Sequence, residues 1–286
     1  MATNLTNVSK AIATIQGEAV FNFNEVNVFL PLITSAQAPQ GAGNINFPIY
    51  NQLDSDDVVG SEGAEGTTPD KQVTASTRTC TPTRRGVFTT LSDEVAVGGA
   101  GVVNNVGQIL GNAVASKFDN DCADISFSTN SVGSTGDALT LATFFSGMQK
   151  IKESGAPAPY SFVTNAGGIW GANGIRPLLL DVATGTSTTS GDVLGSAGDQ
   201  YATSGYVTRV GLCNIFNSEE INDDDTDVTA LMFGKSAIVC GIGAMGLLKI
   251  EQQRVATKGA WEIVGSGFYD VQLGQETHGC AVTHAS

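Results

Sequence analysis

The segment between residues 51 and 71 limits what this chain can fold into more than any other part of the sequence. It carries six acidic residues against one lysine, so a folded domain could not bury it. INFPIY (45–50) precedes it, and in residues 72–81 Thr, Val and Ala alternate with polar residues at the strand period. The pattern predicts a long two-stranded ribbon with an acidic tip. Because an isolated ribbon is only marginally stable in water, we expect it to pack on a neighbouring copy.

The composition favours a β-rich mixed fold. The 286 residues include 35 glycines and runs of Thr, Ser and Asn, which favour strands and turns over a helical bundle. Hydrophobic residues make up 41% of the chain and charged residues 15%, which allows a sizeable core. A formal net charge of −14 would repel phosphate backbones and anionic lipids. We therefore expect neither nucleic acid nor a membrane as a direct ligand.

Two helices are expected. Ser92 can cap the first, with Asp93 and Glu94 in the first turn, where negative charge suits the helix dipole. An apolar stripe then recurs every three or four residues through Val103, Val106, Leu110, Val114, Phe118, Cys122 and Ile125. The second helix is predicted from Asp137 to about Ser154, with a glycine as its stop. Its apolar face consists of Leu141, Phe144, Met148 and Ile151.

The rest of the chain is expected to be extended. Residues 1–38 hold scattered apolar positions interrupted by Asn and ended by a proline, which we interpret as an extended arm. Strands are predicted at 160–164 and 205–216, with a surface loop at 184–191. From Val228 onwards, apolar segments alternate with glycine turns and predict closing strands at ALMFG, SAIVC, GLLKI, AWEIV and CAVTH.

The cysteines and the hydropathy indicate a soluble protein of a reducing compartment. Five widely spaced cysteines never form a C-x-x-C pair, which predicts free thiols at Cys80, Cys122, Cys213, Cys240 and Cys280. The start, MATNLTNVSKAIATIQ, lacks the basic region and continuous apolar stretch of a signal peptide. The longest uncharged apolar stretch, between Lys235 and Lys249, is shorter than the roughly 20 residues that span a bilayer.

One segment imitates a cofactor-binding motif. Gly241, Gly243 and Gly246 match G-x-G-x-x-G directly after a strand-like run, a pattern that can hold a dinucleotide phosphate. A nucleotide-binding fold also needs a helix after the motif and further βα units. Gly259 interrupts any such helix early, and nothing upstream supplies the missing units. We expect no cofactor, and an NAD-dependent oxidoreductase built on Gly241–Gly246 is the alternative from another class.

Two triplets imitate metal sites: Asp223, Asp225 and Asp227, and His278, Cys280 and His284. The aspartates have the spacing of a calcium loop, but Val228 and Gly234 stand where that loop needs a glycine and a glutamate. The second triplet lies near the C-terminus and lacks a fourth ligand for zinc. The sequence contains no nucleophile elbow, P-loop or H-E-x-x-H, so we expect neither a metal site nor a catalytic site.

The order of these features resembles a known family. VVGSEGAEGTTPD followed by TRRGVFTTLSDE looks like an extended loop that returns into a long spine helix, formed by GQILGNAVASKFDNDCADI. YSFVTNAGGIWGANGI and GYVTRVGLCNIFNSEEI resemble parts of an axial domain, and AWEIVGSGFYDVQLGQETHGCAVT resembles the closing strands of a peripheral domain. Nearly the whole chain is similar to the major capsid proteins of tailed double-stranded DNA bacteriophages, which have the HK-97-like fold.

The resemblance implies an α+β fold with five segments: an N-terminal arm (1–38), an extended loop or β-ribbon (39–90), a peripheral domain with the spine helix (91–136), an axial domain (137–227) and closing strands, mainly of the peripheral domain (228–286). Contacts between subunits are expected from charged residues of the extended loop: Asp54, Asp56, Asp57, Glu62, Glu65, Lys71, Arg78, Arg84 and Arg85.

The resemblance also implies a structural role and no enzyme activity. Copies of the chain would assemble into the hexamers and pentamers of an icosahedral capsid that encloses packaged dsDNA without sequence-specific binding. A separate scaffolding protein, a portal and a decoration or cement protein are the further partners implied. Assembly is expected in the host bacterial cytoplasm, and the final location is the virion capsid. An encapsulin-like compartment shell is the alternative among shell proteins.

Overall fold

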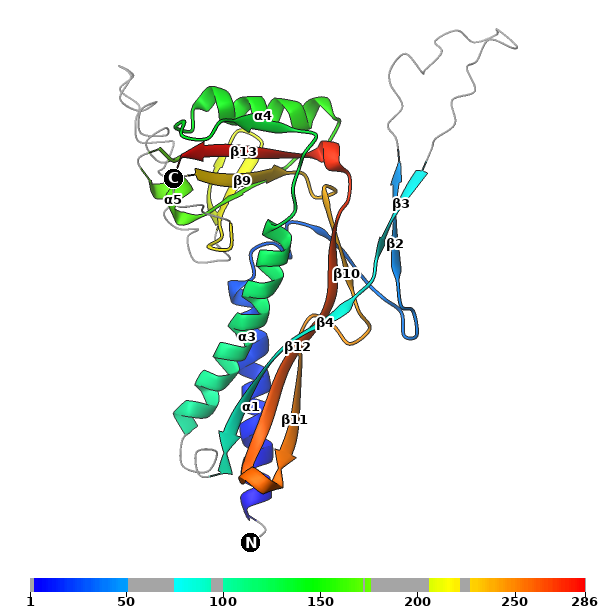
Figure 1. Ribbon diagram of the computed structural model, residues 1–286, viewed down its shortest axis with the longest axis vertical. Helices are drawn as coiled ribbons and strands as arrows, with labels where there is room; N and C mark the ends of the chain where they lie inside the picture. The colour runs from blue at the N-terminus through cyan, green and yellow to red at the C-terminus, as the bar shows by residue number, and fades with distance from the viewer. Residues whose placement is uncertain are drawn as a thin grey trace, which may run out of the picture.

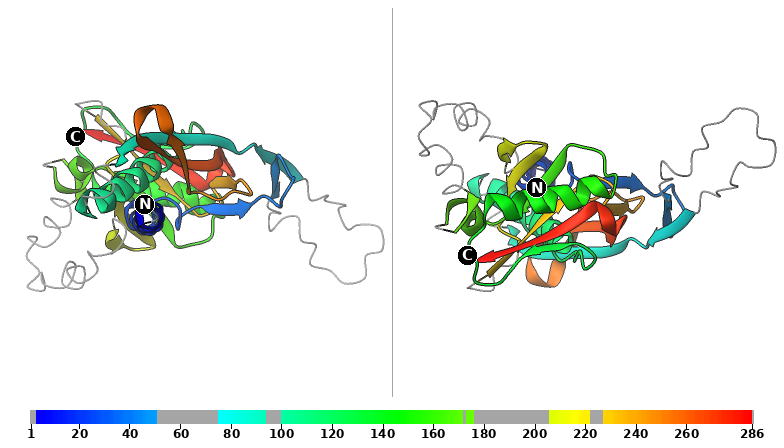
Figure 2. Two further views of the ribbon diagram at one scale, coloured as in Figure 1. Left: turned by 90° about the horizontal axis from the view of Figure 1, so that it is seen from below. Right: turned by 90° about the horizontal axis from the view of Figure 1, so that it is seen from above.

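The computed structural model describes residues 3–50, 75–93, 100–171, 173–175, 206–221 and 227–285. The body is elongated, with a lower and an upper half (Figure 1). The lower half contains a pair of long helices beside a sheet, and the upper half contains a second sheet that carries a helix. A pair of strands projects sideways from the body (Figure 2). None of the described helices is long and apolar enough to cross a membrane.

The lower sheet is built around one long strand. It contains β1 (Thr34–Gln37), β4 (Thr83–Ser92), β10 (Ile238–Ile242), β11 (Lys249–Val255) and β12 (Ala260–Leu273). β12 pairs antiparallel with β4 along one side and with β10 and β11 along the other, and β1 joins β10 in parallel. The 14 residues of β12 therefore pair with three of the other strands, and β1 is attached through β10.

The helices α1 (Thr3–Val26) and α3 (Ala100–Ala123) lie side by side in the lower half (Figure 1). Ile15, Ala19 and Phe23 of α1 recur every four residues and are buried. They face glycines of α3. A Cβ on Gly107 would lie 2.7 Å from the Ile15 carbonyl oxygen, and a Cβ on Gly111 would overlap the Ala19 carbonyl oxygen. The glycines therefore allow the two backbones to approach closely.

The expected extended conformation of residues 1–38 is wrong for the segment that forms α1. The physical reason is that helix stability in proteins comes mainly from tertiary packing, and α1 packs on glycines about 90 positions later in the chain. No local pattern within the first 38 residues contains that partner.

The expected long helix with its apolar stripe is confirmed. Four members of the stripe are buried: Leu110, Val114, Phe118 and Cys122. Phe118 packs edge-on against Tyr269 of β12, with ring centroids 5.0 Å apart. Ser92, the predicted cap, is the last residue of β4, and residues 94–99 lie outside the described ranges.

The upper sheet has six strands in the order β5-β13-β9-β6-β8-β7. They are β5 (Ser131–Gly133), β6 (Tyr160–Thr164), β7 (Tyr206–Val210), β8 (Cys213–Asn217), β9 (Asp227–Phe233) and β13 (Gly279–Ala285). Every residue of β6 is buried, as YSFVT predicts. Residues 205–216, predicted as one strand, contain a turn between β7 and β8, because Gly211 has a φ of 61°. A short helix, α5 (Ala166–Trp170), follows β6.

The helix α4 (Leu141–Glu153) packs on the upper sheet and confirms the second predicted helix. Its start differs from the predicted one, because the Thr140 hydroxyl accepts a hydrogen bond from the Thr143 N–H at 3.1 Å and caps the helix there. Asp137 instead lies in the preceding turn, where its N–H donates to Ser134 O. The chain leaves α4 at Gly155, whose φ of 74° suits a helix stop.

The closing strands are divided between the two sheets. β10, β11 and β12 belong to the lower sheet, whereas β9 and β13 belong to the upper sheet. The short helices η2 (Ala256–Lys258) and η3 (Glu276–His278) connect them. β9 and β13 pair with each other and not with β12, and the assignment of residues 228–286 mainly to a peripheral domain stays a prediction.

Candidate assembly surfaces

The predicted ribbon is present as a pair of antiparallel strands, β2 (Ile45–Tyr50) and β3 (Ala75–Cys80), that projects from the body (Figure 1). All residues of β3 except Cys80 are exposed. Tyr50, at the outer end of β2, is 57% exposed. The outer portion of the ribbon therefore contributes little to the core of its own subunit.

The root of the ribbon is fixed to the lower sheet. Phe47 and Cys80 are buried there against Val239 of β10. A Cβ on Gly241 would lie 2.5 Å from the Cys80 Cβ, so only a glycine leaves room for the ribbon at this point. The Thr81 N–H also donates to an Asp270 carboxylate oxygen at 2.7 Å. These contacts set the direction in which the ribbon projects.

All five cysteines are free and buried, which confirms the predicted free thiols. Burial, followed by the negative charge of Asp270, raises the pKa of Cys80 to about 11. Burial likewise raises the pKa of Cys240 to about 12. These thiols therefore stay protonated near neutral pH and act as small apolar side chains.

The charged residues predicted to contact other subunits fall into two groups. Six of them lie outside the described residues: Asp54, Asp56, Asp57, Glu62, Glu65 and Lys71. Arg78 lies on the exposed outer surface of β3, in register with Phe47 of β2, and no ion pair joins it to another described residue. Within the described residues, the Arg78 guanidinium therefore has no ion pair that would compete with a contact to another subunit.

Arg84 and Arg85 both bind within their own subunit. Arg84 on β4 lies 3.3 Å from Glu251 of β11, and both side chains are about half exposed. Arg85 lies 3.7 Å from Asp121 of α3. Lys117 and the Tyr269 hydroxyl bind the same Asp121 carboxylate, at 2.7 and 2.9 Å. The arginines thus tie β4 to neighbouring elements, an arrangement that sequence spacing did not reveal.

A hollow of about 550 Å³ on β4, η2 and β12, with both apolar and charged residues in its lining, was missed by the sequence analysis. Its lining includes Val87 and Phe88 of β4, and Phe88 is 69% exposed. Lys258 and Glu262 lie at the same hollow and pair with each other at 3.4 Å. No local pattern marked this hollow, because its lining comes from β4, η2 and β12, which are far apart in the chain.

The glycine motif is not a phosphate site. Gly241 lies within β10 and pairs with β12. The Gly243 N–H donates to the Phe268 carbonyl, and Gly246 forms a turn with a φ of 86°. The segment that follows is the strand β11, so no helix N-terminus is available for a phosphate.

The structure brings neither metal-like triplet together within the residues that it describes. Residues 222–226 lie outside the described ranges, and Asp227 accepts a hydrogen bond from the Gly136 N–H at 2.6 Å. His278 binds Ser236, and the ring of His284 lies 2.7 Å from the Ala285 carbonyl oxygen. Among the described residues, no three His, Cys, Asp or Glu side chains are grouped to hold a metal ion.

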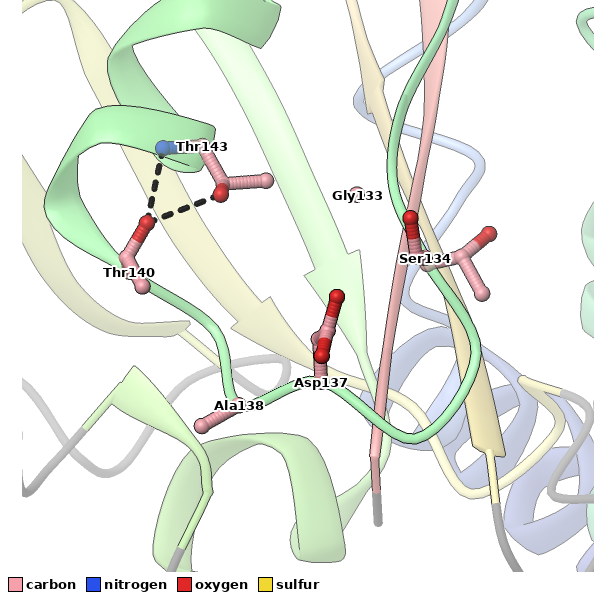
Figure 3. A pocket seen from close by; sticks show the side chains of 7 residues that line it. Gly133, Ser134, Asp137, Ala138, Thr140 and Thr143 are labelled. Carbon is pink, nitrogen blue, oxygen red and sulfur yellow. Dashed lines mark hydrogen bonds between the residues drawn. The ribbon is translucent and has the colours of Figure 1, made fainter.

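A polar pocket of about 400 Å³ lies where α4 meets β5 and β13 (Figure 3). Its lining is rich in hydroxyls, and Thr140 and Thr143 bind each other at 2.8 Å. Asp137 is the single ionisable residue among those that line it. Such a lining offers neither a nucleophile with a paired base nor a metal ligand set.

No protein-family model matches the sequence, and no curated protein resembles it at a significant level. Solved structures match over most of the chain. An acid-stable capsid of the Helicobacter pylori bacteriophage KHP30 has a TM-score of 0.65 at 9% identity, and the match covers 91% of each chain. The capsid of the cyanophage P-SCSP1u has a TM-score of 0.62 at 13% identity, covering 92% of this chain and 90% of that chain. A virus-like particle from Pyrococcus furiosus has a TM-score of 0.62 at 8% identity, covering 94% and 98%.

These matches define the fold class of the chain. It has the HK-97-like fold that phage capsid proteins share, with α3 as its long helix and β2–β3 as its projecting ribbon. The α+β fold class predicted from the sequence is therefore confirmed.

Proposed function

We propose that this chain is the major capsid protein of a tailed bacteriophage, a structural subunit whose copies close into an icosahedral shell around packaged DNA. The observation that carries the proposal is the HK-97-like fold, matched over about nine tenths of the chain by phage capsid structures.

We propose that each subunit contacts its neighbours through the ribbon. Its outer surface is exposed in the single chain, and a two-stranded ribbon is marginal in water without packing. Arg78 projects from this surface, and the sequence between the two strands is strongly acidic. Arg84 and Arg85 contribute less than the sequence analysis proposed, because both already have partners within the subunit.

The negative charge of the chain suits a shell that encloses DNA without binding it tightly. With a formal net charge of −14, the wall repels the phosphate backbone, so packaging and release are not hindered by tight binding. We propose hexamers and pentamers as the assembly units and the virion capsid as the location. A scaffolding protein, a portal and a decoration protein, acting in the host cytoplasm, complete the proposal.

A second candidate is an encapsulin-like compartment, a shell that encloses protein cargo. The comparisons do not favour it over the capsid, because phage capsid structures predominate among the matches and the virus-like particle shows only the shared fold. Both candidates use the same fold and the same kind of contact, and they differ in what the shell contains.

The test is electron microscopy of the purified full-length chain, expressed alone and with the proteins encoded beside it. Shells that contain DNA support the capsid proposal, and shells filled with protein favour the compartment. Small discrete particles that never close into shells under any of these conditions contradict both. Binding of NAD to the purified chain would contradict the structural role.

A further inference from the structure

Besides the route from β4 through α3 to β5, the chain crosses directly from a strand of one sheet to a strand of the other at two places that lie against each other. The first crossover, residues 234–237, leads from β9 to β10, and the second crossover, residues 274–278, leads from β12 to β13. The Gly274 N–H donates to the Ala237 carbonyl at 2.8 Å, and the Gln275 N–H donates to the Ser236 carbonyl at 3.1 Å. These hydrogen bonds join the upper and lower halves, beside an apolar core that includes Phe233 of the upper sheet and Tyr269 of the lower sheet.

His278 joins both crossovers to a third element. Its side chain belongs to the second crossover and is 5% exposed. Its Nδ1 lies 2.6 Å from the Ser236 hydroxyl of the first crossover, and its Nε2 lies 3.2 Å from the Ser154 carbonyl at the end of α4. The His278 carbonyl also accepts from the Gly234 N–H at 2.9 Å.

These partners fix the form of the imidazole ring. A carbonyl oxygen can only accept, so Nε2 must carry a proton toward Ser154. In the neutral ring Nδ1 is then the acceptor, and the Ser236 hydroxyl donates to it. A second proton on Nδ1 would face that hydroxyl proton and force Ser236 to turn. It would also place a full charge at a nearly buried position.

We propose that His278 is a proton-sensitive lock: the neutral ring holds the two crossovers and the end of α4 together, and its protonation loosens the junction between the two sheets. The device regulates the proposed shell subunit, because the angle between its two halves would then depend on pH. That consequence for shell geometry rests on the proposed function, whereas the lock itself does not.

The surroundings of His278 offer no charge to stabilise its protonated form. The charged residues closest in sequence to the contacts on the three elements are Glu153, Lys235 and Glu276, and none of them hydrogen-bonds to the ring. The Glu276 carboxylate is occupied by Ser128, whose hydroxyl lies 2.6 Å away, and by the Thr129 N–H. Burial lowers the pKa of His278, and the hydrogen bond to Ser154 opposes this shift only in part.

The sign of the pH effect follows from this lowered pKa. The unfolded or opened state takes up a proton near pH 6.5, whereas the closed junction takes it up only at lower pH. The contribution of the lock is therefore complete above about pH 6.5 and is lost as the pH falls below that value.

The experiment is hydrogen exchange by mass spectrometry on the full-length unassembled chain at pH 8 and pH 5.5, with intrinsic rates corrected. In the wild type, protection of peptides that contain the two crossovers should fall by up to about tenfold for each pH unit below 6.5. In His278→Gln, which keeps one donor and one acceptor but does not titrate in this range, this fall in protection at low pH should be absent. Peptides from regions remote from the junction serve as internal references.

The matched control is His284→Gln, which removes the other histidine of the chain. This variant should keep the full pH effect. The proposal is overturned if the wild type shows no pH effect, if His278→Gln shows the same effect, or if His284→Gln abolishes it.

If His278→Gln does not fold, the ring of His278 is titrated by NMR in His284→Gln, where it is the single histidine. The protection of the crossover peptides must then be lost with the same pH midpoint as the titration of the His278 ring. A different pH midpoint would refute the lock. Because unassembled chains are used, a failure here is distinguishable from a failure to form shells.

Discussion

The strands β3 and β6 have similar lengths but opposite environments. Every residue of β6 is buried between α4 and its neighbouring strands, whereas β3 exposes all its residues except Cys80 at its root. β6 is therefore stabilised by packing within its own subunit. The ribbon is fixed at one end and depends on something outside the subunit for the rest of its length. The difference teaches that the ribbon adds little to the fold of its own subunit, and this is why we propose the ribbon as the contact between subunits.

The largest effect should come from cutting a side chain out of the core. Phe118→Ala removes a fully buried ring that packs on Tyr269, and we expect a loss of about 3 to 5 kcal/mol in the free energy of unfolding. The matched change in the ribbon, Tyr50→Ala, should stay within about 0.5 kcal/mol of the wild type, because the ring is 57% exposed. Urea unfolding of both variants measures the difference. Equal losses would break the comparison.

The helix pair gives a second contrast, between two glycines. Gly111→Ala places a Cβ against the Ala19 carbonyl and should destabilise the chain by about 1 to 3 kcal/mol. Gly17 lies in α1 with nothing near its missing Cβ, so Gly17→Ala should stabilise the helix by about 0.5 to 1 kcal/mol. Thermal unfolding followed by circular dichroism compares them. Two changes of the same sign would mean that α1 does not pack on α3 as described.

Much of this architecture was predictable from the sequence, and the failures have a common cause. The stripe of α3, the face of α4 and the buried YSFVT segment are local patterns, and all three were read correctly. α1 was missed because its partner glycines lie far along the chain. The internal partners of Arg84 and Arg85 were missed for the same reason, since Glu251 and Asp121 come from distant elements. Strand membership of β9 and β13 also depends on long-range pairing, which periodicity does not encode.

A buried acid on α3 should give a smaller effect that depends on pH. The Asp119 carboxylate accepts the N–H groups of Val28 and Phe29, at 2.9 and 3.2 Å, and holds the chain just after α1. Burial nevertheless outweighs these bonds and raises the pKa of Asp119 to about 7. The folded state therefore holds the proton between about pH 4 and 7, so this group adds stability as the pH falls, opposite in sign to His278.

Asp119→Asn tests this assignment, because it removes the titration and keeps one acceptor. In urea unfolding, the free energy of unfolding of the variant minus that of the wild type should be more positive at pH 8 than at pH 5. A stability difference that is the same at both values would show that Asp119 does not titrate in this range.

The smallest effect is expected at an exposed ion pair of β4. Arg84→Ala removes the contact with Glu251, in which both side chains are about half exposed, and such pairs add little to stability. Thermal unfolding should stay close to that of the wild type, and the remaining difference should shrink in high salt. A large, salt-independent loss would place Arg84 in the folding core and weaken the contrast between regions.

The most direct test of the separation between folding and assembly is to replace residues 51–74 with a short Gly-Ser turn. The described root contacts of Phe47 and Cys80 would be kept. Sedimentation velocity and circular dichroism are then measured on the same preparation, under conditions in which the wild type forms shells. The account predicts the circular dichroism spectrum and thermal unfolding of a folded subunit, together with small species and no shells. Shells of normal size from the shortened chain would contradict it.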